Sequence, residues 1–179
     1  MTLAALLVLA QLTSSHASSA PSPPATAGGL SWAVPKGWTA APGSSMRVAT
    51  YRTPAAPGDP EGGEVAIFYF GPGQGGGVDA NVERWISQLT PEPGSKKPSR
   101  SKSQVGDIPV TFCMTEGTYS TGMAAPGASA APKKGFALEG AIAEGKQGAV
   151  FFKLTGPKKS VAKAKADFDA LVRSLRKAP

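Results

Sequence analysis

The sequence predicts an α+β fold, in which an antiparallel β-sheet of about six strands is covered by two main helices. Three observations lead to this prediction. The expected strands mostly follow one another along the chain as hairpins, only two stretches have the apolar period of a helix, and one of those two ends the chain. This order is typical of an antiparallel sheet with helices packed on it. The length of 179 residues accommodates one domain with a short appendage.

Three strands are expected in the first half of the domain, at residues 30–34, 45–52 and 64–70. A Pro-Lys-Gly turn follows the first. The third reads Glu-Val-Ala-Ile-Phe-Tyr-Phe and is apolar at both alternating sets of positions, which indicates a central strand covered on both faces. Residues 54–63 are rich in Pro and Gly and are predicted to form a surface loop.

A helix is expected from about residue 79 to 89, with Asp79 as its N-cap. Its apolar residues recur at the spacing of one helix face, so Trp85 is expected in the core rather than in a ligand platform with Trp32 and Trp38. This stripe consists of Val82, Trp85, Ile86 and Leu89. Residues 91–103 are polar and basic and are predicted to form an exposed loop.

Residues 108–115 alternate apolar and polar side chains, which is the period of a half-buried strand. Cys113 lies on the face that also carries Thr111 and Thr115, and we expect it to be a buried, unreactive side chain. Residues 120–134 are a low-complexity stretch of Gly, Ala, Pro and Ser and are predicted to form another loop.

The end of the chain is expected to form a hairpin and a helix. Residues 136–144 and 148–155 flank a Gly-Lys turn, and the second arm places Val150, Phe152 and Leu154 on one face. Residues 157–177 have a continuous apolar stripe with lysines off that stripe, which predicts an amphipathic helix. The stripe comprises Val161, Ala164, Phe168, Leu171, Val172 and Leu175.

Residues 1–17 are predicted to be a signal peptide, because an apolar run is followed by small residues that suit cleavage after Ala17 or, alternatively, after Ala20. No Lys or Arg precedes this run, so either the signal is a weak one or translation starts upstream. Residues 18–29 then form a Pro/Ser/Ala/Gly tether to a single domain at residues 30–177. We expect an extracytoplasmic protein, secreted or periplasmic. No stretch approaches the roughly 18–20 apolar residues of a transmembrane helix.

Cleavage at either position would remove His16 and leave no histidine in the mature chain. Catalytic triads and zinc sites that need imidazole are then excluded, and Cys113 alone cannot form an internal disulfide. A Ser–Lys nucleophile pair stays open, with Ser44, Ser45 and Ser120 as candidates. We therefore expect no catalytic, cofactor-binding or metal-binding residues, no cofactor, and a protein that is not an enzyme.

Residues 71–76 read Gly-Pro-Gly-Gln-Gly-Gly and fit the G-x-G-x-x-G pattern of a dinucleotide-binding turn. The proline removes one backbone donor, and Asp79 places negative charge where a pyrophosphate would bind. The neighbouring strands are expected as hairpins rather than as a βαβ unit. We interpret this segment as a pliable connection from a strand to a helix.

Basic residues concentrate in the second half of the chain, where residues 95–179 carry fifteen of the nineteen Lys and Arg residues but six of the twelve acidic ones. Such an excess can bind an anionic polymer or lipid headgroups, or can simply keep a domain soluble. Nucleic acid is not expected as a partner, because the basic loop has no aromatic residue to stack on a base. The candidate polyanion contacts are Lys96, Lys97, Arg100, Lys102, Lys158, Lys159, Lys163 and Lys165.

Several of these features together resemble the PsbP-like superfamily. They are the first strand followed by Pro35, Gly37 and Trp38, the mid-chain helix Asn-Val-Glu-Arg-Trp at residues 81–85, and the terminal hairpin and helix. The resemblance covers residues 30–177 and is closest to uncharacterised exported bacterial members. It implies a small α/β/α sandwich with an accessory role, since known members mostly bind other proteins. Metal sites of photosynthetic members use His side chains, which the mature chain lacks.

We therefore expect a non-catalytic exported accessory domain that binds an envelope or secreted protein partner. The alternative is an electrostatic binder of anionic polymer or lipid headgroups, which would use the eight basic residues named above. An enzyme is the least expected of the three.

Overall fold

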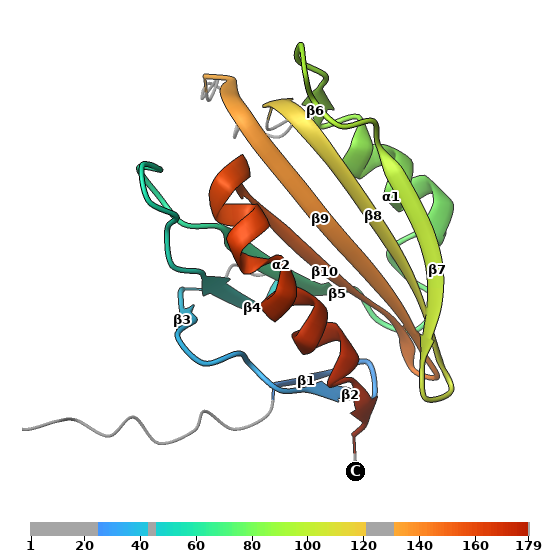
Figure 1. Cartoon of the computed structure of the whole chain (residues 1–179). Helices are drawn as coiled ribbons and strands as arrows, with labels where there is room; N and C mark the ends of the chain where they lie inside the picture. Colours follow the sequence, from blue (N-terminus) through green and yellow to red (C-terminus); the bar gives the residue numbers. More distant parts are fainter. Residues whose placement is uncertain (1–24, 43–45, 121–130, 179) are drawn as a thin grey trace, which may run out of the picture.

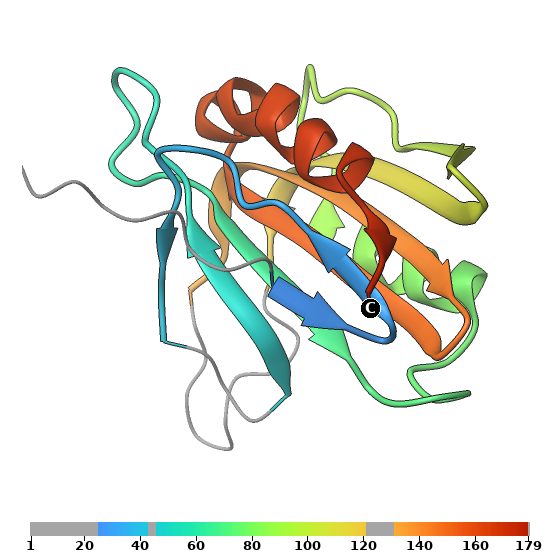
Figure 2. The same cartoon turned by 90° about the horizontal axis from the view of Figure 1, so that it is seen from below.

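The computed structural model describes residues 25–42, 46–120 and 131–178 (Figure 1). The predicted signal peptide, the first part of the predicted tether and most of the predicted loop at residues 120–134 lie outside the described residues. The described residues form a large antiparallel sheet with a helix on each face, and a second, small sheet (Figure 1, Figure 2). Neither described helix is long and apolar enough to cross a membrane.

The large sheet has eight strands, and all of its pairings are antiparallel. Seven strands follow in the order β3 (Thr39–Ala40), β4 (Arg47–Arg52), β5 (Glu64–Tyr69), β10 (Gly148–Pro157), β9 (Lys133–Gly145), β8 (Ile108–Tyr119) and β6 (Leu89–Thr90). The eighth, β7 (Ser99–Val105), also pairs with β8. The small sheet consists of β1 (Ala25–Ala27), β2 (Leu30–Trp32) and β11 (Arg176–Lys177). The helices are α1 (Val78–Ile86) and α2 (Lys158–Arg173).

The α+β class, the two main helices and the antiparallel sheet are confirmed, but the expected number of about six strands is too small. Four strands that were not predicted have two or three residues each, which is too short for a period to show. They are β1, β3, β6 and β11. β7 was missed because it is polar along its length; backbone pairing with β8 holds it in the sheet. The exposed loop expected at residues 91–103 therefore ends before residue 99.

The β9–β10 hairpin forms the centre of the large sheet, and both of its faces are buried. Val150, Phe152 and Leu154 share one face, as predicted, and are buried in the core under α2. Phe151 points to the opposite face and packs with Trp85 of α1. Because apolar side chains are buried on both sides, this hairpin is the frame on which the two helices pack.

β8 is covered on both faces, which corrects the expectation of a half-buried strand. Thr111, Cys113 and Thr115 are each at most 3% exposed, although two of them are polar. The reason is that α1 packs against β8 on the face that these residues share. The predicted burial of Cys113 is confirmed.

Gly77 is the N-cap of α1, so the prediction that Asp79 caps the helix is wrong; Asp79 lies in the first turn. Asn81 explains the difference, because its side-chain amide donates hydrogen bonds to two backbone oxygens of the segment before the helix. The helix also ends earlier than predicted, at Ile86. Leu89, expected in the helix, begins β6.

Both ends of the described domain meet in the small sheet. Residues 25–27, expected in the tether, form β1 because they pair with β2. The terminal helix ends at Arg173 rather than near residue 177, since residues 176–177 turn back and also pair with β2. The Ser174 hydroxyl fixes this turn by accepting a hydrogen bond from the Ala33 N–H at 2.8 Å. Figure 2 shows the small sheet beside the C-terminal end of α2.

The loop at residues 54–63 is anchored to the start of α2. The Asp59 carboxylate accepts hydrogen bonds from the backbone N–H of Ser160 at 2.8 Å and from its hydroxyl at 2.7 Å. Ser160 is fully buried, and its Oγ accepts a further hydrogen bond from the Ala56 N–H at 2.9 Å. A carboxylate at this place satisfies a free N–H of the first helical turn and suits the positive end of the helix dipole.

α1 lies close to the sheet because Gly140 of β9 has no side chain. A Cβ at this position would lie 2.6 Å from the Trp85 ring and 2.7 Å from the Cys113 Sγ. Trp85 is 4% exposed, so the prediction that it belongs to the core is confirmed. Its indole occupies the space that a larger residue at position 140 would need.

We predict that Gly140→Ala lowers the free energy of unfolding by about 1–3 kcal/mol, the usual cost of overpacking a core. Urea denaturation measures this change. In a Trp85→Leu background the same substitution should cost markedly less, since the ring atoms nearest to the new Cβ are gone. An equal cost in both backgrounds would show that Trp85 does not set the spacing between α1 and the sheet.

Candidate functional site

α1 covers only part of its face of the large sheet. It packs against β8 and β9, and it does not extend over β4 and β5 (Figure 1). The strand pairings bring six side chains together there, on what we call the open face. The open face comprises Arg47, Arg52, Glu64, Phe68, Lys153 and Thr155.

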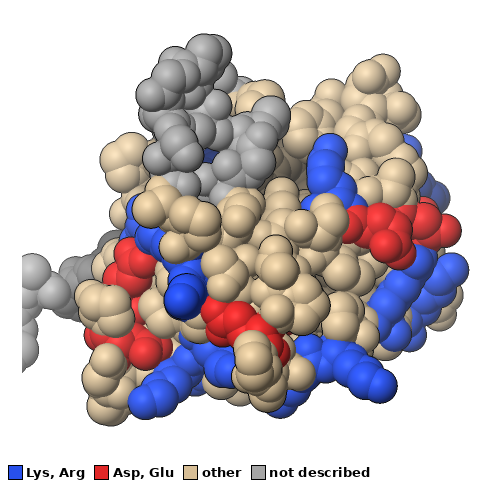
Figure 3. Space-filling model, turned by 90° about the horizontal axis from the view of Figure 1, so that it is seen from above, with Lys and Arg blue, Asp and Glu red and all other residues tan. Residues whose placement is uncertain are grey.

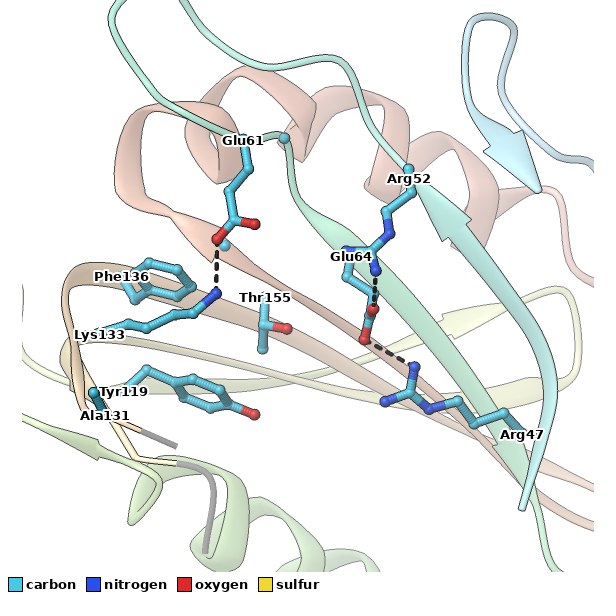
Figure 4. A pocket seen from close by; sticks show the side chains of 11 residues that line it. Arg47, Arg52, Glu61, Glu64, Tyr119, Ala131, Lys133, Phe136 and Thr155 are labelled. Atoms are coloured by element: carbon cyan, nitrogen blue, oxygen red, sulfur yellow. Dashed lines mark hydrogen bonds and ion pairs between the residues drawn. The ribbon is translucent and has the colours of Figure 1, made fainter. Parts of the chain in front are cut away.

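Four residues of the open face, Arg47, Arg52, Glu64 and Thr155, form one wall of a pocket of about 210 Å³ (Figure 4). In this wall Glu64 lies between two arginines, and its carboxylate pairs with Arg47 at 2.8 Å and with Arg52 at 2.9 Å. The loop anchored to α2 contributes Glu61, which pairs with Lys133 at 2.8 Å. The lining is completed by Gly62, Tyr119, Ala131, Phe136, Thr155 and Gly156.

Two stacked aromatic rings form another side of the pocket, as Figure 4 shows. The ring centroids of Tyr119 and Phe136 lie 6.0 Å apart, and the rings are inclined by 8°. Lys133 Nζ lies 5.2 Å from the Phe136 centroid, which is a cation–π geometry. The pocket therefore combines cations, carboxylates and aromatic rings, the mixture that fixes the orientation of a bound group.

A β-bulge places Arg47 on the open face. Arg47 pairs with Phe68 and Ala49 pairs with Ile67, so β4 has one residue more than β5 between these two pairs. Strict alternation from Arg52 would send Arg47 to the opposite, buried face. The inserted residue moves the Arg47 side chain from the buried face of the sheet to the open face. No feature of the β4 sequence predicts the insertion.

Lys153, in the middle of the open face, was not predicted as a site residue. Its Nζ donates hydrogen bonds to Gln88 Oε1 at 2.7 Å and to the Tyr119 hydroxyl at 3.4 Å. None of the ion pairs of the described residues includes Lys153. Burial, together with the nearby positive charges of Arg47 and Arg84, lowers the pKa of Lys153 to about 8.

A signal for Lys153 is present in the sequence. It is the one charged residue in the run Phe-Phe-Lys-Leu of a strand whose other face is apolar. Once Phe152 and Leu154 are assigned to the core, alternation places Lys153 on the other face, next to Phe151. A single cation between apolar residues of a central strand therefore indicates a candidate site residue.

The thiol of Cys113 and the hydroxyl of Tyr119 are not activated as nucleophiles. Burial raises the pKa of the Cys113 thiol to about 12, so the thiol stays protonated and unreactive. Burial also raises the pKa of the Tyr119 hydroxyl. Within residues 25–42, 46–120 and 131–178, no three His, Cys, Asp or Glu side chains are grouped so that they could hold a metal ion.

Two of the serines considered for a Ser–Lys pair, Ser44 and Ser45, lie outside the described residues. Ser120 is exposed after the end of β8, and its backbone N–H donates to the Gln88 carbonyl at 2.9 Å. Among the hydrogen bonds that lysine amines of the described residues make, none involves the Ser120 hydroxyl. The described geometry therefore shows no Ser–Lys pair at Ser120.

The eight basic residues predicted as polyanion contacts lie on two sides of the large sheet. Arg100 and Lys102 belong to β7, and they oppose Cys113 and Thr111, whose side chains face α1. Arg100 accordingly forms an ion pair with Asp79 of α1. These two cations thus belong to the α1 side of the molecule.

The predicted lysines of α2 lie on the opposite side. Lys158 of α2 pairs with Glu116 at 3.6 Å, and Lys165 of α2 pairs with Glu139 at 3.8 Å. Lys96, which precedes β7 in the chain, also pairs with Glu116 at 3.6 Å. The remaining three, Lys97, Lys159 and Lys163, are exposed. Viewed from the end of the sheet where α2 begins, basic and acidic side chains lie next to one another (Figure 3). The eight residues do not form one continuous basic surface, and polyanion binding through either group stays a prediction.

Two further sequence features are structural. Trp32 and Trp38 are buried in the core under α2, whereas Trp85 is buried on the other side of the sheet, so the three indoles do not form a ligand platform. Residues 71–76 connect β5 to α1, and β5 is antiparallel to both of its neighbours. The glycine-rich segment therefore has no βαβ context, in agreement with its interpretation as a connection.

No protein-family model matches the chain, and no curated protein matches it. Solved structures, however, match the chain in fold. Cyanobacterial PsbP (CyanoP) from Synechocystis sp. PCC 6803 has 12% sequence identity and a TM-score of 0.52, over 93% of this chain and 99% of that one. A protein from Bacteroides thetaiotaomicron VPI-5482 has 15% identity and a TM-score of 0.50, over 87% of this chain and 47% of that one, so this chain spans about half of its length.

A third similar structure is LpqN, involved in cell envelope biogenesis of Mycobacterium tuberculosis, with 15% identity and a TM-score of 0.49 over 84% of this chain and 83% of that one. The match to CyanoP covers nearly the whole of both chains. The fold is therefore PsbP-like, as the sequence resemblance implied. At this level of identity the comparison concerns the fold alone.

Lys153 gives the stability of the fold a defined dependence on pH. The pKa of its amine is about 8 in the folded protein and near 10.5 in an unfolded chain. Below pH 8 the amine is charged in both states, and burying that charge opposes folding. Between the two values the unfolded chain binds more protons than the folded one, so the contribution of Lys153 to the free energy of unfolding rises with pH.

We predict that Lys153→Met is more stable than the wild type at pH 7, and that this advantage shrinks as the pH rises from about 8 to 10.5. Urea denaturation in amine buffers measures the difference between the two proteins at each pH, so the titration of other groups cancels. Lys159→Met, which removes an exposed amine of α2, is the control. A difference that stays constant over this pH range would mean that Lys153 is not buried as a cation.

Proposed function

We propose that this protein is a non-catalytic domain that binds a protein partner outside the cytoplasm, and that the partner docks beside the open face. One observation carries the proposal. Three large apolar side chains of the described residues are exposed, Met46 at 57%, Val48 at 45% and Phe70 at 40%, and all three come from the ends of β4 and β5 that lie together. We call them the apolar edge. Clustered exposed apolar side chains are typical of protein interaction sites.

The apolar edge is joined to the open face through Phe68. The Phe68 and Phe70 rings stack with their centroids 6.1 Å apart, and the Arg47 guanidinium lies 5.7 Å from the Phe68 centroid. Phe70 also contacts the buried Phe151 ring edge to face at 5.6 Å. Aromatic residues, Met and Arg are the residue types enriched at protein interfaces, and rings supported by a core are the rigid anchors that such interfaces use.

The backbone beside the apolar edge supports the same proposal. β3 pairs with β4 only at Tyr51 and Arg52. Within the described residues, the part of β4 from Arg47 to Ala49 therefore has a strand partner on one side only. Its bulge makes this edge irregular, which discourages pairing with any passing strand. A partner of matching shape can still use the free backbone groups.

The charge around the pocket favours an acidic partner. Three cations of the lining, Arg47, Arg52 and Lys133, pair with its two carboxylates, Glu64 and Glu61. A fourth cation, Lys153, lies next to the lining, where its amine contacts the Tyr119 hydroxyl. A partner that presents carboxylates next to apolar side chains would match both the open face and the apolar edge. Charge complementarity of this kind mainly sets the rate of association and the choice of partner.

We predict that a photo-crosslinking amino acid at position 48 or 70 captures one protein from the extracytoplasmic fraction of the source cells. The same amino acid at Ala162, on the exposed side of α2, should capture none. Val48→Asp and Phe70→Ser should each reduce binding of the captured protein at least about tenfold, because each removes an anchor of the interface. Ala162→Asp is the matched control. Crosslinks that form equally well from position 162, or that disappear at high salt in every variant, would contradict docking at the apolar edge and favour the polyanion alternative.

The location outside the cytoplasm is tested by the mature amino terminus. We predict that the protein recovered from the extracytoplasmic fraction begins at residue 18 or 21, which follow the two small-residue cleavage positions. Intact-mass measurement of the native protein determines the cut. A protein found in the cytoplasm with its first residues uncleaved would contradict this part of the proposal.

A further inference from the structure

We propose that β7 binds an extended, acidic segment of a partner protein, and that this segment adds one antiparallel strand to the large sheet. The site goes beyond the docking at the apolar edge and does not depend on it, because β7 and β4 lie toward opposite margins of the sheet (Figure 1). Addition of a strand to an exposed sheet edge is a common way in which proteins recognise peptides.

β7 is a regular strand with a neighbour on one side only. Its seven residues, Ser99–Val105, pair with β8 without a register shift, and none of them pairs with another strand of the described residues. Six of the seven are exposed. Exposed edges are often interrupted by a bulge or a proline, but β7 contains neither. A straight edge of this length can therefore accept a further strand.

The turn of the β7–β8 hairpin determines which backbone groups of β7 point outward. Gly106 and Asp107 form a two-residue turn, and Gly106 has the positive φ, 61°, that such turns use. The pair that closes this turn, Val105 and Ile108, is a hydrogen-bonded pair, and such pairs alternate with non-hydrogen-bonded ones along an antiparallel ladder. The residues of β7 whose N–H and C=O groups face away from β8 are therefore Arg100, Lys102 and Gln104.

These outward groups are available to a new strand. Apart from the pairing with β8, no hydrogen bond of the described ranges involves a backbone group of β7. An added strand would bond to these groups without displacing a partner within the protein.

The α1 side of β7 favours carboxylates on the added strand. Arg100 and Lys102 both lie on this side. Arg100 pairs with Asp79, which is 77% exposed, so this surface ion pair leaves other N–H groups of the guanidinium for a second carboxylate. Lys102 takes part in no ion pair within the described part of the chain. Directly opposed residues share a face of the sheet, so we expect acidic residues opposite both cations, separated by one residue.

The α2 side of β7 favours an apolar residue between the two acidic ones. Ser101 lies on this side opposite Phe112 of β8, and Ser99 lies opposite Met114. Phe112 and Met114 are half-buried, and a serine is too small to cover them. An apolar side chain opposite Ser101 would lie over the serine and bury more of Phe112. The segment that fits β7 therefore alternates acidic and apolar residues.

A second copy of this chain does not fit the same edge. In the antiparallel register that pairs all seven residues of β7 with those of another copy, Lys102 lies opposite its own counterpart. The neighbouring register of the same kind places Arg100 opposite Lys102. Like charges directly opposite one another destabilise a pair of strands, whereas opposite charges stabilise it. The two cations therefore disfavour self-pairing and favour a partner of the opposite charge.

The free edge is tested first in the full-length protein alone, by hydrogen exchange of backbone amides followed by NMR. We expect the amides of Arg100 and Lys102 to exchange quickly, because they face away from β8. The amides of Ser101 and Ser103 should be protected by their bonds to β8. Equal protection of the two sets would mean that β7 does not have a free edge, and it would overturn the proposal.

The probe for binding is the peptide Val-Glu-Val-Glu-Val-Glu-Val, which has the seven-residue length of β7 and the expected alternation. We expect it to bind the full-length protein and to slow the exchange of the Arg100 and Lys102 amides. Methylation of two glutamate amide nitrogens should weaken binding at least about tenfold, because these N–H groups would bond to β7. Methylation of two valine amide nitrogens, which would face away from β7, should leave the affinity unchanged.

The two methylated peptides carry the same charge, so their comparison separates strand pairing from attraction by charge alone. Equal binding of the two, or tighter binding of the peptide methylated at its glutamates, would overturn the proposal. Absence of binding of the unmodified peptide at about 1 mM would also overturn it.

Three variants locate the peptide on the protein. Lys102→Glu should weaken binding about threefold to tenfold, because it places a carboxylate opposite a carboxylate. Lys159→Glu makes the same change of charge at an exposed lysine of α2, so it is the matched control and should bind as the wild type does. Val48→Asp, at the apolar edge, should also bind the peptide unchanged. Equal affinity of Lys102→Glu and Lys159→Glu, or a loss of binding in Val48→Asp, would overturn the assignment of the site to β7.

Discussion

The packing of one indole onto one glycine determines how the two faces of this domain differ. Trp85 rests on Gly140, where a Cβ would come within 2.6 Å of the ring. This contact holds α1 tightly over β8 and β9. Because α1 has only nine residues, a helix placed there cannot also cover β4 and β5. The long α2 and the small sheet bury the opposite face far more completely, as the larger core on that side shows.

The same glycine shapes the polar half of the sheet. Gly140 pairs across the strands with Lys153, which in turn pairs with Ala66. With small residues on both sides, the lysine stem can lie along the sheet while the amine reaches Gln88 and Tyr119. The open face is therefore not an unfinished core. It is a row of long polar side chains that lie over small ones. Glu64 pairs with two arginines, and Lys153 takes part in none of the ion pairs of the described residues.

Long, strongly patterned elements could be predicted from the sequence, and the candidate site could not. The apolar stripe of α2 and the alternation of Val150, Phe152 and Leu154 are local signals, and the structure agrees with both. The position of Arg47 depends on a bulge in strand pairing, which is a relation between two strands. Strand β7 is polar and pairs through its backbone, so no side-chain pattern records it. The candidate polyanion contacts were predicted from the excess of basic residues in the second half of the chain, and the fold distributes these contacts over two sides of the sheet.

The link between Asp59 and Ser160 has a consequence for recognition. Asp59 and Glu61 belong to the same loop, so the hydrogen bonds that hold this loop on the first turn of α2 also position the carboxylate that pairs with Lys133 at the pocket. One wall of the cavity is thus set before any ligand arrives. A guest would not have to immobilise that segment, and the entropic penalty of association is smaller by that amount. Selectivity for a guest at this wall would then depend on a buried serine of α2, which does not itself line the pocket.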